Sequence, residues 1–223
     1  MFQDRRARVR SYETVESIAN EARRRGRIEN QSRFNVVDYI KGPLAIILRP
    51  DLEVILFDKN DYNVPAFVNI SPKSRAPKIY VEKFVWRNAE AGGEDSRYIL
   101  SHEIGHVLMH GHDELAFCGS TFSHLASLQP EERVEPQANL FADLFLVPEN
   151  MASDFSCAED IAYYFNVPID CALRRYEHIT DKSRRKKFRN YIGEACPECA
   201  NFTLVRNGTC LKCDTCGSTT GCS

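Results

Sequence analysis

The residues best suited to chemistry are two histidines and a glutamate in the stretch His102-Glu103-Ile104-Gly105-His106. Four residues advance an α-helix by about 400°, so the two imidazoles share one face. They can therefore bind one Zn²⁺ at about 2.1 Å from each ring nitrogen. Glu103 lies about 100° further round the helix, where it can take a proton from water without being a ligand. The pattern predicts a catalytic zinc site with Glu103 as general base.

A catalytic zinc site needs a third protein ligand, and three residues compete for that role. His110 lies eight residues after His102, about 12 Å along a regular helix, too far to share one ion. His112 has the spacing of the third histidine in HExxHxxGxxH sites, although the glycine that ends the helix in those sites is replaced. Glu135 fits the sites that an acidic residue from a second helix completes. The sequence favours Glu135 over His112, and His110, His112 and Tyr98 are further active-site candidates.

A second group of residues that can bind metal lies in the last 28 residues, which hold six of the nine cysteines. Cys196 and Cys199 form one CxxC pair, and Cys213 and Cys216 form another after thirteen intervening residues. Four thiolates at this spacing are typical of a closed, tetrahedral structural zinc site. A segment this short buries little apolar surface, so the metal would supply the energy that folds it. The sequence therefore predicts two zinc ions, one catalytic and one structural.

The second cysteine pair has an alternative, because Cys210 and Cys213 also form a CxxC pair. Gly217 follows Cys216, as the turn of a zinc knuckle requires, so we favour Cys213 and Cys216 and keep Cys210 as the alternative ligand. The stretch 207–222 also looks similar to the cysteine-rich C-terminal end of vitamin-B12-dependent ribonucleotide reductases. In those enzymes such cysteines are associated with thiol exchange, so a redox dithiol is the competing interpretation of this tail.

The elements that must position these residues follow from hydrophobic periodicity and turn residues. Helical spacing predicts helices over residues 12–25, 33–41, 95–110, 132–146, 158–165 and 168–178. β-Branched runs predict strands over residues 45–48, 54–57, 66–70 and 78–81. The helix over 95–110 carries the two histidines and ends at Gly111, and the helix over 132–146 carries Glu135. The pattern is that of an α+β fold with a small antiparallel or mixed sheet packed on the histidine-bearing helix.

The composition narrows the class of protein. Apolar residues make up 43% and charged residues 27% of the 223 residues, which excludes wholesale disorder, collagen and coiled coil. The net charge of −2 gives no overall basic field for nucleic acid. The apolar runs are far below the ~20 residues that span a bilayer, and the first residues do not read as a signal peptide. We expect a cytoplasmic protein without membrane partners.

Two stretches resemble a known family. Residues 98–110 (YILSHEIGHVLMH) resemble the active-site helix of the ImmA/IrrE zinc metallopeptidases, and residues 135–148 (EPQANLFADLFLVP) resemble the second signature of that family. The resemblance covers roughly residues 12–180. The sequence departs from the family mildly: Asp143 stands where a second alanine is usual, and the ending at 145–148 differs. Neither departure removes a ligand.

The resemblance implies a zincin-like fold with His102, His106 and Glu135 as zinc ligands and Glu103 as base. His110 also matches the family pattern, without a role that follows from the residues alone. Nickel, cobalt or iron could take the same ligands in place of zinc. Members of the family often cleave helix-turn-helix repressors or antitoxins, so the implied function is a zinc endopeptidase acting on a protein regulator.

A competing interpretation is a non-proteolytic regulator or adaptor that binds DNA or protein. Residues 158–176 resemble a helix-turn-helix, and residues 182–189 carry six positive and no negative charges. Contact with DNA is one function for this region, and we favour the other, a packing element with a solvated charged tail. The cysteine tail could also cover the active site or recruit substrate. We expect three parts: a peptidase domain over 1–150, a helical segment over 151–194 and a zinc-ribbon-like module over 195–223.

Overall fold

A computed structural model of the chain describes residues 6–70, 76–110, 128–189 and 192–220, and the side chains of 183–189 are not described. The chain divides into two compact units, Met1–Tyr176 and Glu177–Ser223. This division falls inside one helix, at a different place from the expected boundaries at 150 and 194. The three-part organisation stays a prediction, and the two units are described separately below.

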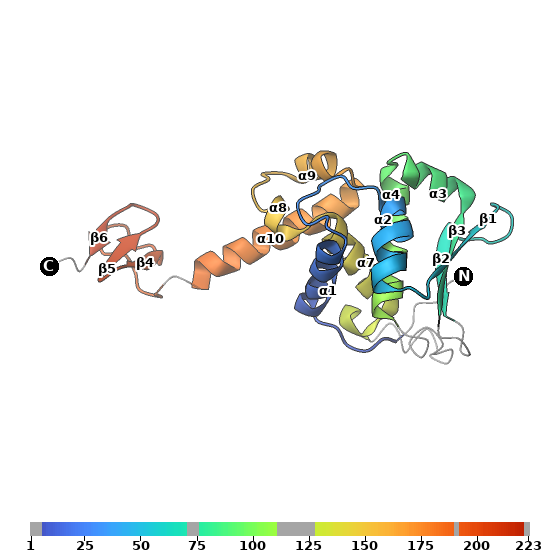
Figure 1. Cartoon of the computed structure of the whole chain (residues 1–223). Helices are drawn as coiled ribbons and strands as arrows, with labels where there is room; N and C mark the ends of the chain where they lie inside the picture. The colour runs from blue at the N-terminus through green and yellow to red at the C-terminus, as the bar shows by residue number, and fades with distance from the viewer. Residues whose placement is uncertain (1–5, 71–75, 111–127, 190–191, 221–223) are drawn as a thin grey trace. The chain divides into compact units, whose positions relative to one another are not determined.

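The first unit is a mixed α+β structure, as expected (Figure 1). Its helical elements in chain order are α1 (Tyr12–Arg25), α2 (Val36–Tyr39), the π-helix η1 (Ile40–Leu48), α3 (Lys83–Glu90), α4 (Glu94–Met109), the 3₁₀ turn η2 (Pro130–Glu132), α7 (Val134–Leu146), α8 (Glu149–Ala152), α9 (Ala158–Phe165) and the first part of α10 (Ile169–Arg189). Its strands are β1 (Glu53–Phe57), β2 (Ala66–Ile70) and β3 (Pro77–Glu82).

The sheet of the first unit is small and mixed. The strand order is β1-β3-β2, with β1 parallel and β2 antiparallel to the central strand. Val54 pairs with Ile79 on one side of β3, and Val68 pairs with Ile79 on the other. β2 is the strand that packs against α4, so the sheet lies on the histidine-bearing helix as the pattern predicted.

The helices α4 and α7 form the centre of the core, and α7 also packs against α1 (Figure 1). Gly105 permits the close approach of α4 and α7, because a Cβ atom there would lie 3.0 Å from the ring of Phe141. Leu100, Ile104 and Phe141 are fully buried at this interface. The close packing of these two helices is what can bring a residue of α7 beside the histidines of α4.

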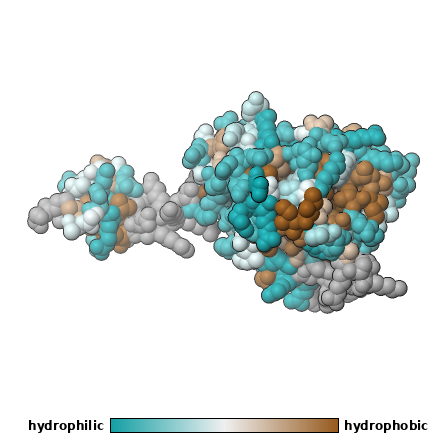
Figure 2. Space-filling view, viewed as in Figure 1, coloured by the Kyte–Doolittle hydropathy of each residue, from teal (hydrophilic) through white to brown (hydrophobic). Residues whose placement is uncertain are grey.

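The predicted strand over 45–48 is wrong, because these residues form the end of the π-helix η1. The side chain of Asn35 accepts hydrogen bonds from the N–H groups of Val37 and Asp38 and so starts the helix that continues into η1. A four-residue apolar run does not distinguish strand from helix by periodicity. Ile46 is 71% exposed. Figure 2 shows apolar patches on an otherwise hydrophilic face.

The other predicted helices differ less from the observed ones. Helix α1 has the bounds that the sequence predicted, and the Ser11 side chain caps its start. Helix α4 ends at Met109, with His110 already in an extended conformation, so the helix stops before Gly111. Helix α3 was not predicted, and α10 extends to Arg189 as one helix through the basic stretch.

The second unit contains a three-stranded antiparallel sheet of β4 (Leu204–Asn207), β5 (Cys210–Cys213) and β6 (Thr219–Thr220), in that order. Its core consists of Cys196, Leu204 and Cys213, with a few half-buried apolar residues against them. Over the described parts of both units, the helices are too short or too polar to cross a bilayer.

Candidate metal centres

The structure brings His102, His106 and Glu135 together at the interface of α4 and α7. The Nε2 atoms of the two histidines lie 2.9 Å apart. One carboxylate oxygen of Glu135 lies 3.2 Å from Nε2 of His102, and the other lies 3.5 Å from Nε2 of His106. Ligand atoms bound tetrahedrally at about 2.1 Å would lie about 3.4 Å apart. The spacing of these three groups therefore fits one small divalent cation, although their role as ligands stays a prediction.

The Nδ1 atom of each of these two histidines, which points away from the ligand group, also has a hydrogen-bond partner. Nδ1 of His102 lies 2.8 Å from the side-chain oxygen of Asn139, and Nδ1 of His106 lies 3.0 Å from Nδ1 of His110. Partners of this kind fix the orientation and tautomer of histidines that bind metal. Asn139 was missed by the sequence reasoning. The signal that could have found it is its position four residues after Glu135, on the same face of α7.

The facing residues show that α4 and α7 run antiparallel. In successive turns, Glu135, Asn139 and Asp143 of α7 face His106, His102 and Tyr98 of α4. The ligand group therefore depends on the register of two helices that are distant in sequence.

Glu103 is buried beside this group and has an unusual environment. Its side chain is 5% exposed, and among the described residues its Oε2 atom has no hydrogen-bond partner. Burial raises the pKa of Glu103 to about 7; the positive charge on His102 opposes the shift, and the negative charge of Glu135 adds to it. A cation beside it would lower this pKa again by charge attraction.

The two histidines differ in their electrostatics. Burial lowers the pKa of His106 well below its usual value, and the neighbouring His102 and His110 add to this effect. Burial also acts against charge on His102, but the hydrogen bond and charge of Glu135 overcome it and raise the pKa of His102. His106 therefore presents a neutral ring with an electron pair, which is the form that binds metal.

The other active-site candidates lie around the ligand group. His110 caps the end of α4 and is 2% exposed, with Nε2 at 3.1 Å from the side-chain oxygen of Gln137. Tyr98 lies one turn before His102, and its hydroxyl accepts a hydrogen bond from Arg174 at 3.0 Å. Burial raises the pKa of Tyr98. His112 lies outside the described residues.

Asp143, which departs from the family pattern, is paired with an arginine of α10. Asp143 accepts two hydrogen bonds from Arg174, at 2.7 and 2.8 Å. The next residue, Arg175, is buried and donates to the carbonyl of Val147 and the hydroxyl of Tyr12. Both arginines of the helix-turn-helix-like segment are thus engaged within the first unit. Contact of this segment with DNA stays a prediction.

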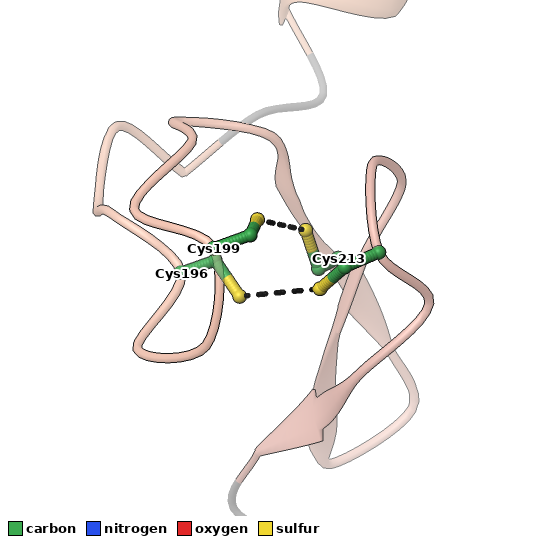
Figure 3. Close-up of side chains that lie close together, drawn as sticks. Cys196, Cys199 and Cys213 are labelled. Carbon is green, nitrogen blue, oxygen red and sulfur yellow. Dashed lines mark hydrogen bonds between the residues drawn. The ribbon is translucent and has the colours of Figure 1, made fainter.

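The second unit brings the four predicted cysteines together. Figure 3 labels three of them, Cys196, Cys199 and Cys213. The sulfur atoms of Cys196 and Cys216 lie 3.7 Å apart, and those of Cys199 and Cys213 lie 3.6 Å apart. Zinc–sulfur bonds of about 2.3 Å at tetrahedral angles place the sulfurs about 3.8 Å apart. The described sulfur positions therefore fit a tetrahedral zinc ion.

The two cysteine pairs sit on two turns with the same backbone hydrogen bonds. The N–H of Ala200 donates to the carbonyl of Cys196, and the N–H of Gly217 donates to the carbonyl of Cys213. In return, the first cysteine of each turn donates to Asn201 or to Ser218. Both residues that follow the pairs have positive φ, 58° for Ala200 and 78° for Gly217. The turn that Gly217 indicated in the sequence is therefore repeated, with alanine in the first copy.

Hydroxyl groups lie beside two of the four sulfurs and favour their thiolate forms. Ser218 Oγ lies 3.2 Å from the sulfur of Cys196 and lowers the pKa of that thiol. The Thr203 hydroxyl lies 3.4 Å from the sulfur of Cys213 and lowers the pKa of that thiol to about 6. Cys210, the alternative ligand, has its sulfur engaged in a disulfide and lies outside this group of four. The choice of the four ligands stays a prediction.

Comparisons with known proteins support both parts of the sequence prediction. A peptidase family model described as the IrrE N-terminal-like domain matches residues 49–177. A vitamin B12-dependent ribonucleotide reductase of Bradyrhizobium diazoefficiens is 29% identical over 191 residues, which cover 85% of this chain and 15% of that protein. A vitamin B12-dependent ribonucleotide reductase of Agrobacterium fabrum is 58% identical over 43 residues, covering 19% of this chain and 3% of that protein. The chain thus corresponds to a small share of each relative, and both predicted resemblances are confirmed.

Proposed function

Because the chain belongs to the peptidase family of the IrrE N-terminal-like domain, we propose that it is a zinc endopeptidase that cleaves a protein. In this proposal His102, His106 and Glu135 hold the catalytic zinc, and Glu103 is the general base. Cys196, Cys199, Cys213 and Cys216 hold a second, structural zinc.

The observation that carries the proposal is the buried carboxylate of Glu103. A carboxyl group that is withdrawn from water and left with an unpaired oxygen destabilises the fold. It lies beside His102, His106 and Glu135, whose possible ligand atoms lie close together. Both features have a simple explanation if the site binds a metal ion and moves a proton.

The residues divide the chemical work. Zinc, when bound, would supply a Lewis acid that polarises the peptide carbonyl and acidifies water. Burial raises the pKa of Glu103 and so favours its carboxylate as a base, while a cation beside it would act in the opposite direction. Its unpaired oxygen is the atom that would take the proton from water and return it to the leaving amine. Asn139 and Glu135 hold the ring of His102 from two sides.

The substrate class is proposed from the family resemblance. A helix-turn-helix repressor or an antitoxin-like regulator is the protein that we expect to be cleaved. In the alternative, the chain is an adaptor that binds DNA or a protein through α9, α10 and the cysteine module, without proteolysis.

The test is cleavage by the zinc-loaded full chain of purified helix-turn-helix regulators, with new chain ends identified by mass spectrometry. The Glu103→Gln variant should lower the rate by about 10²–10⁴-fold, because it removes the base. Glu94→Gln, an exposed carboxyl on the same helix α4, is the matched control and should cleave normally. Equal cleavage by wild type and Glu103→Gln would reject the mechanism. The adaptor gains support if Glu103→Gln keeps all biological activity and removal of 195–223 abolishes it.

A further inference from the structure

A line of hydrogen bonds leads away from His106 on the side opposite the candidate metal site. His106 Nδ1 lies 3.0 Å from His110 Nδ1, and His110 Nε2 lies 3.1 Å from the side-chain oxygen of Gln137. That oxygen also accepts a hydrogen bond of 2.9 Å from Arg10. We call these four residues the His106 relay. His106, His110 and Gln137 are all nearly fully buried, so water does not compete for these bonds.

The far end of the relay fixes which atoms donate and which accept. The amide nitrogen of Gln137 donates to the carbonyls of Arg8 and Glu131, at 2.9 and 2.6 Å. Carbonyls can only accept and the Arg10 guanidinium can only donate, so the orientation of the Gln137 amide is determined. Its oxygen must then accept from His110 as well, and the hydrogen of a neutral His110 ring must be on Nε2.

The position of the hydrogen on His110 in turn determines the position of the hydrogen on His106. With its hydrogen on Nε2, His110 presents an electron pair at Nδ1, and this atom can only accept from Nδ1–H of His106. His106 then has no hydrogen on Nε2, the atom that faces His102 and Glu135. We propose that His110 is a positioning residue that holds His106 in its metal-binding tautomer, with Gln137 and Arg10 setting the direction. This inference rests on the proposed metal site.

Part of the relay comes from outside the region that matches the peptidase family. Arg8 and Arg10 precede the matched residues 49–177. Their segment lies against the start of α7, where Ala7 and Arg10 donate backbone hydrogen bonds to Glu132 and Glu131. Arg10 also donates to the carbonyl of Met109, the last residue of α4. The N-terminal segment therefore ties together the ends of the two helices that carry the candidate ligands.

The test compares two substitutions of His110 in the full chain. His110→Phe keeps a ring but removes the acceptor, and His110→Asn keeps an acceptor oxygen near the position of Nδ1. The measurement is the dissociation constant for Co²⁺ at the histidine site, by competition with a chelator. The thiolate-to-cobalt absorption of the cysteine module serves as internal reference. We expect His110→Phe to weaken binding about 10–100-fold and His110→Asn to restore most of it.

Tyr39→Phe is the control for a general loss of stability, because it removes a buried hydrogen bond to Ala22 far from the relay. It should leave the Co²⁺ dissociation constant unchanged. Wild-type affinity in His110→Phe would overturn the relay while leaving the proposed metal site intact. Failure of the wild type to bind at the histidines would overturn both.

A second measurement needs no variant. Ring nitrogen NMR of the metal-free wild type should find the hydrogen of His106 on Nδ1 and that of His110 on Nε2. Hydrogen on Nε2 of His106 would contradict the proposal directly.

Discussion

The two candidate metal centres both hold their possible ligand atoms within 4.8 Å of one another, but they are built in opposite ways. The first places its residues on α4 and α7, within a large core that includes Ile104 and Phe141. The second places its residues on two turns, and its buried core is Cys196, Leu204 and Cys213. Two of the three core residues of the second unit are therefore candidate ligands themselves.

The first unit should therefore fold without a metal ion, whereas the second unit should need one to fold. The scaffold of the first unit has enough apolar burial to keep an unfavourable feature, the buried Glu103 carboxylate, whose Oε2 has no hydrogen-bond partner among the described residues. The second unit has no comparable apolar core among its described residues, so we expect a metal ion on its four cysteines to supply much of its stability. Removing metal should affect the two units very differently.

The largest expected effect is on the cysteine module. Chelation of zinc, or the substitution Cys199→Ser, should unfold the second unit, because structural zinc sites contribute about 10–16 kcal/mol of binding free energy. The first unit should stay folded. The measurement is the set of backbone amide NMR signals of the full chain, in which those of residues 192–220 should collapse to disordered positions. Dispersed signals for these residues after chelation would remove the basis of the comparison.

The zinc content of the purified protein tests the assignment of one zinc ion to each of the two sites. Wild-type protein should contain two zinc ions per chain, and His106→Ala and Cys199→Ser should each contain one. Two zinc ions in either variant would show that the corresponding residue is dispensable. Zinc at the histidines alone would favour the redox dithiol as the role of the tail.

The next effect concerns Glu103 and the way the stability of the first unit depends on pH. The folded pKa of Glu103 is about 7, above its usual value of about 4.5, so the folded state binds more protons between these pH values. The metal-free first unit should therefore lose stability as the pH rises from 4.5 through 7. Glu103→Gln stays neutral, so its stability advantage over wild type should grow by about 3 kcal/mol over this window.

Urea unfolding of chelated wild type and Glu103→Gln at pH 4.5 and pH 8 measures this difference. Adding zinc at pH 8 should reduce it, because the cation favours the charged carboxylate. Parallel pH profiles for the two proteins would show that Glu103 is not destabilising when charged, and would weaken its assignment as a buried base.

The smallest effect tests the turns of the cysteine module. Ala200 has a positive φ that glycine adopts without strain. Ala200→Gly should stabilise the module, and Gly217→Ala should destabilise it, each by about 1 kcal/mol. The measurement is the chelator concentration at which half of the zinc leaves the cysteines. Shifts of the same sign in both variants would mean that backbone strain does not limit this site.

Local patterns were enough to predict the two candidate ligand groups. The spacing of His102 and His106 is set by one turn of helix, and each CxxC pair is set by one tight turn. Asn139 and Gln137 were missed because their roles depend on the register of α4 against α7, which packing determines. Arg10 was missed for the same reason, since its partners lie more than ninety residues away.

The errors in the fold have a related cause. Residues 45–48 form a short apolar run that is compatible with strand or helix, and the cap at Asn35 decided the outcome. Cys210 has ligand spacing with Cys213, and the structure groups Cys213 with Cys196, Cys199 and Cys216. A small antiparallel or mixed sheet was predicted because each of its three strands is an apolar run between turn residues, and the structure has the mixed form.

The contact of the N-terminal residues with α7 determines which N-terminal truncations of the chain can stay folded. Val15, Ala19 and Ala22 of α1 are buried in the core, and the Arg10 side chain lies against Gln137. A fragment that began at residue 49, where the family match starts, would leave the α1-facing side of α7 in water. Exposed apolar surface of this kind promotes aggregation. The smallest soluble peptidase fragment should therefore begin near Arg6, well before the part of the chain that identifies its family.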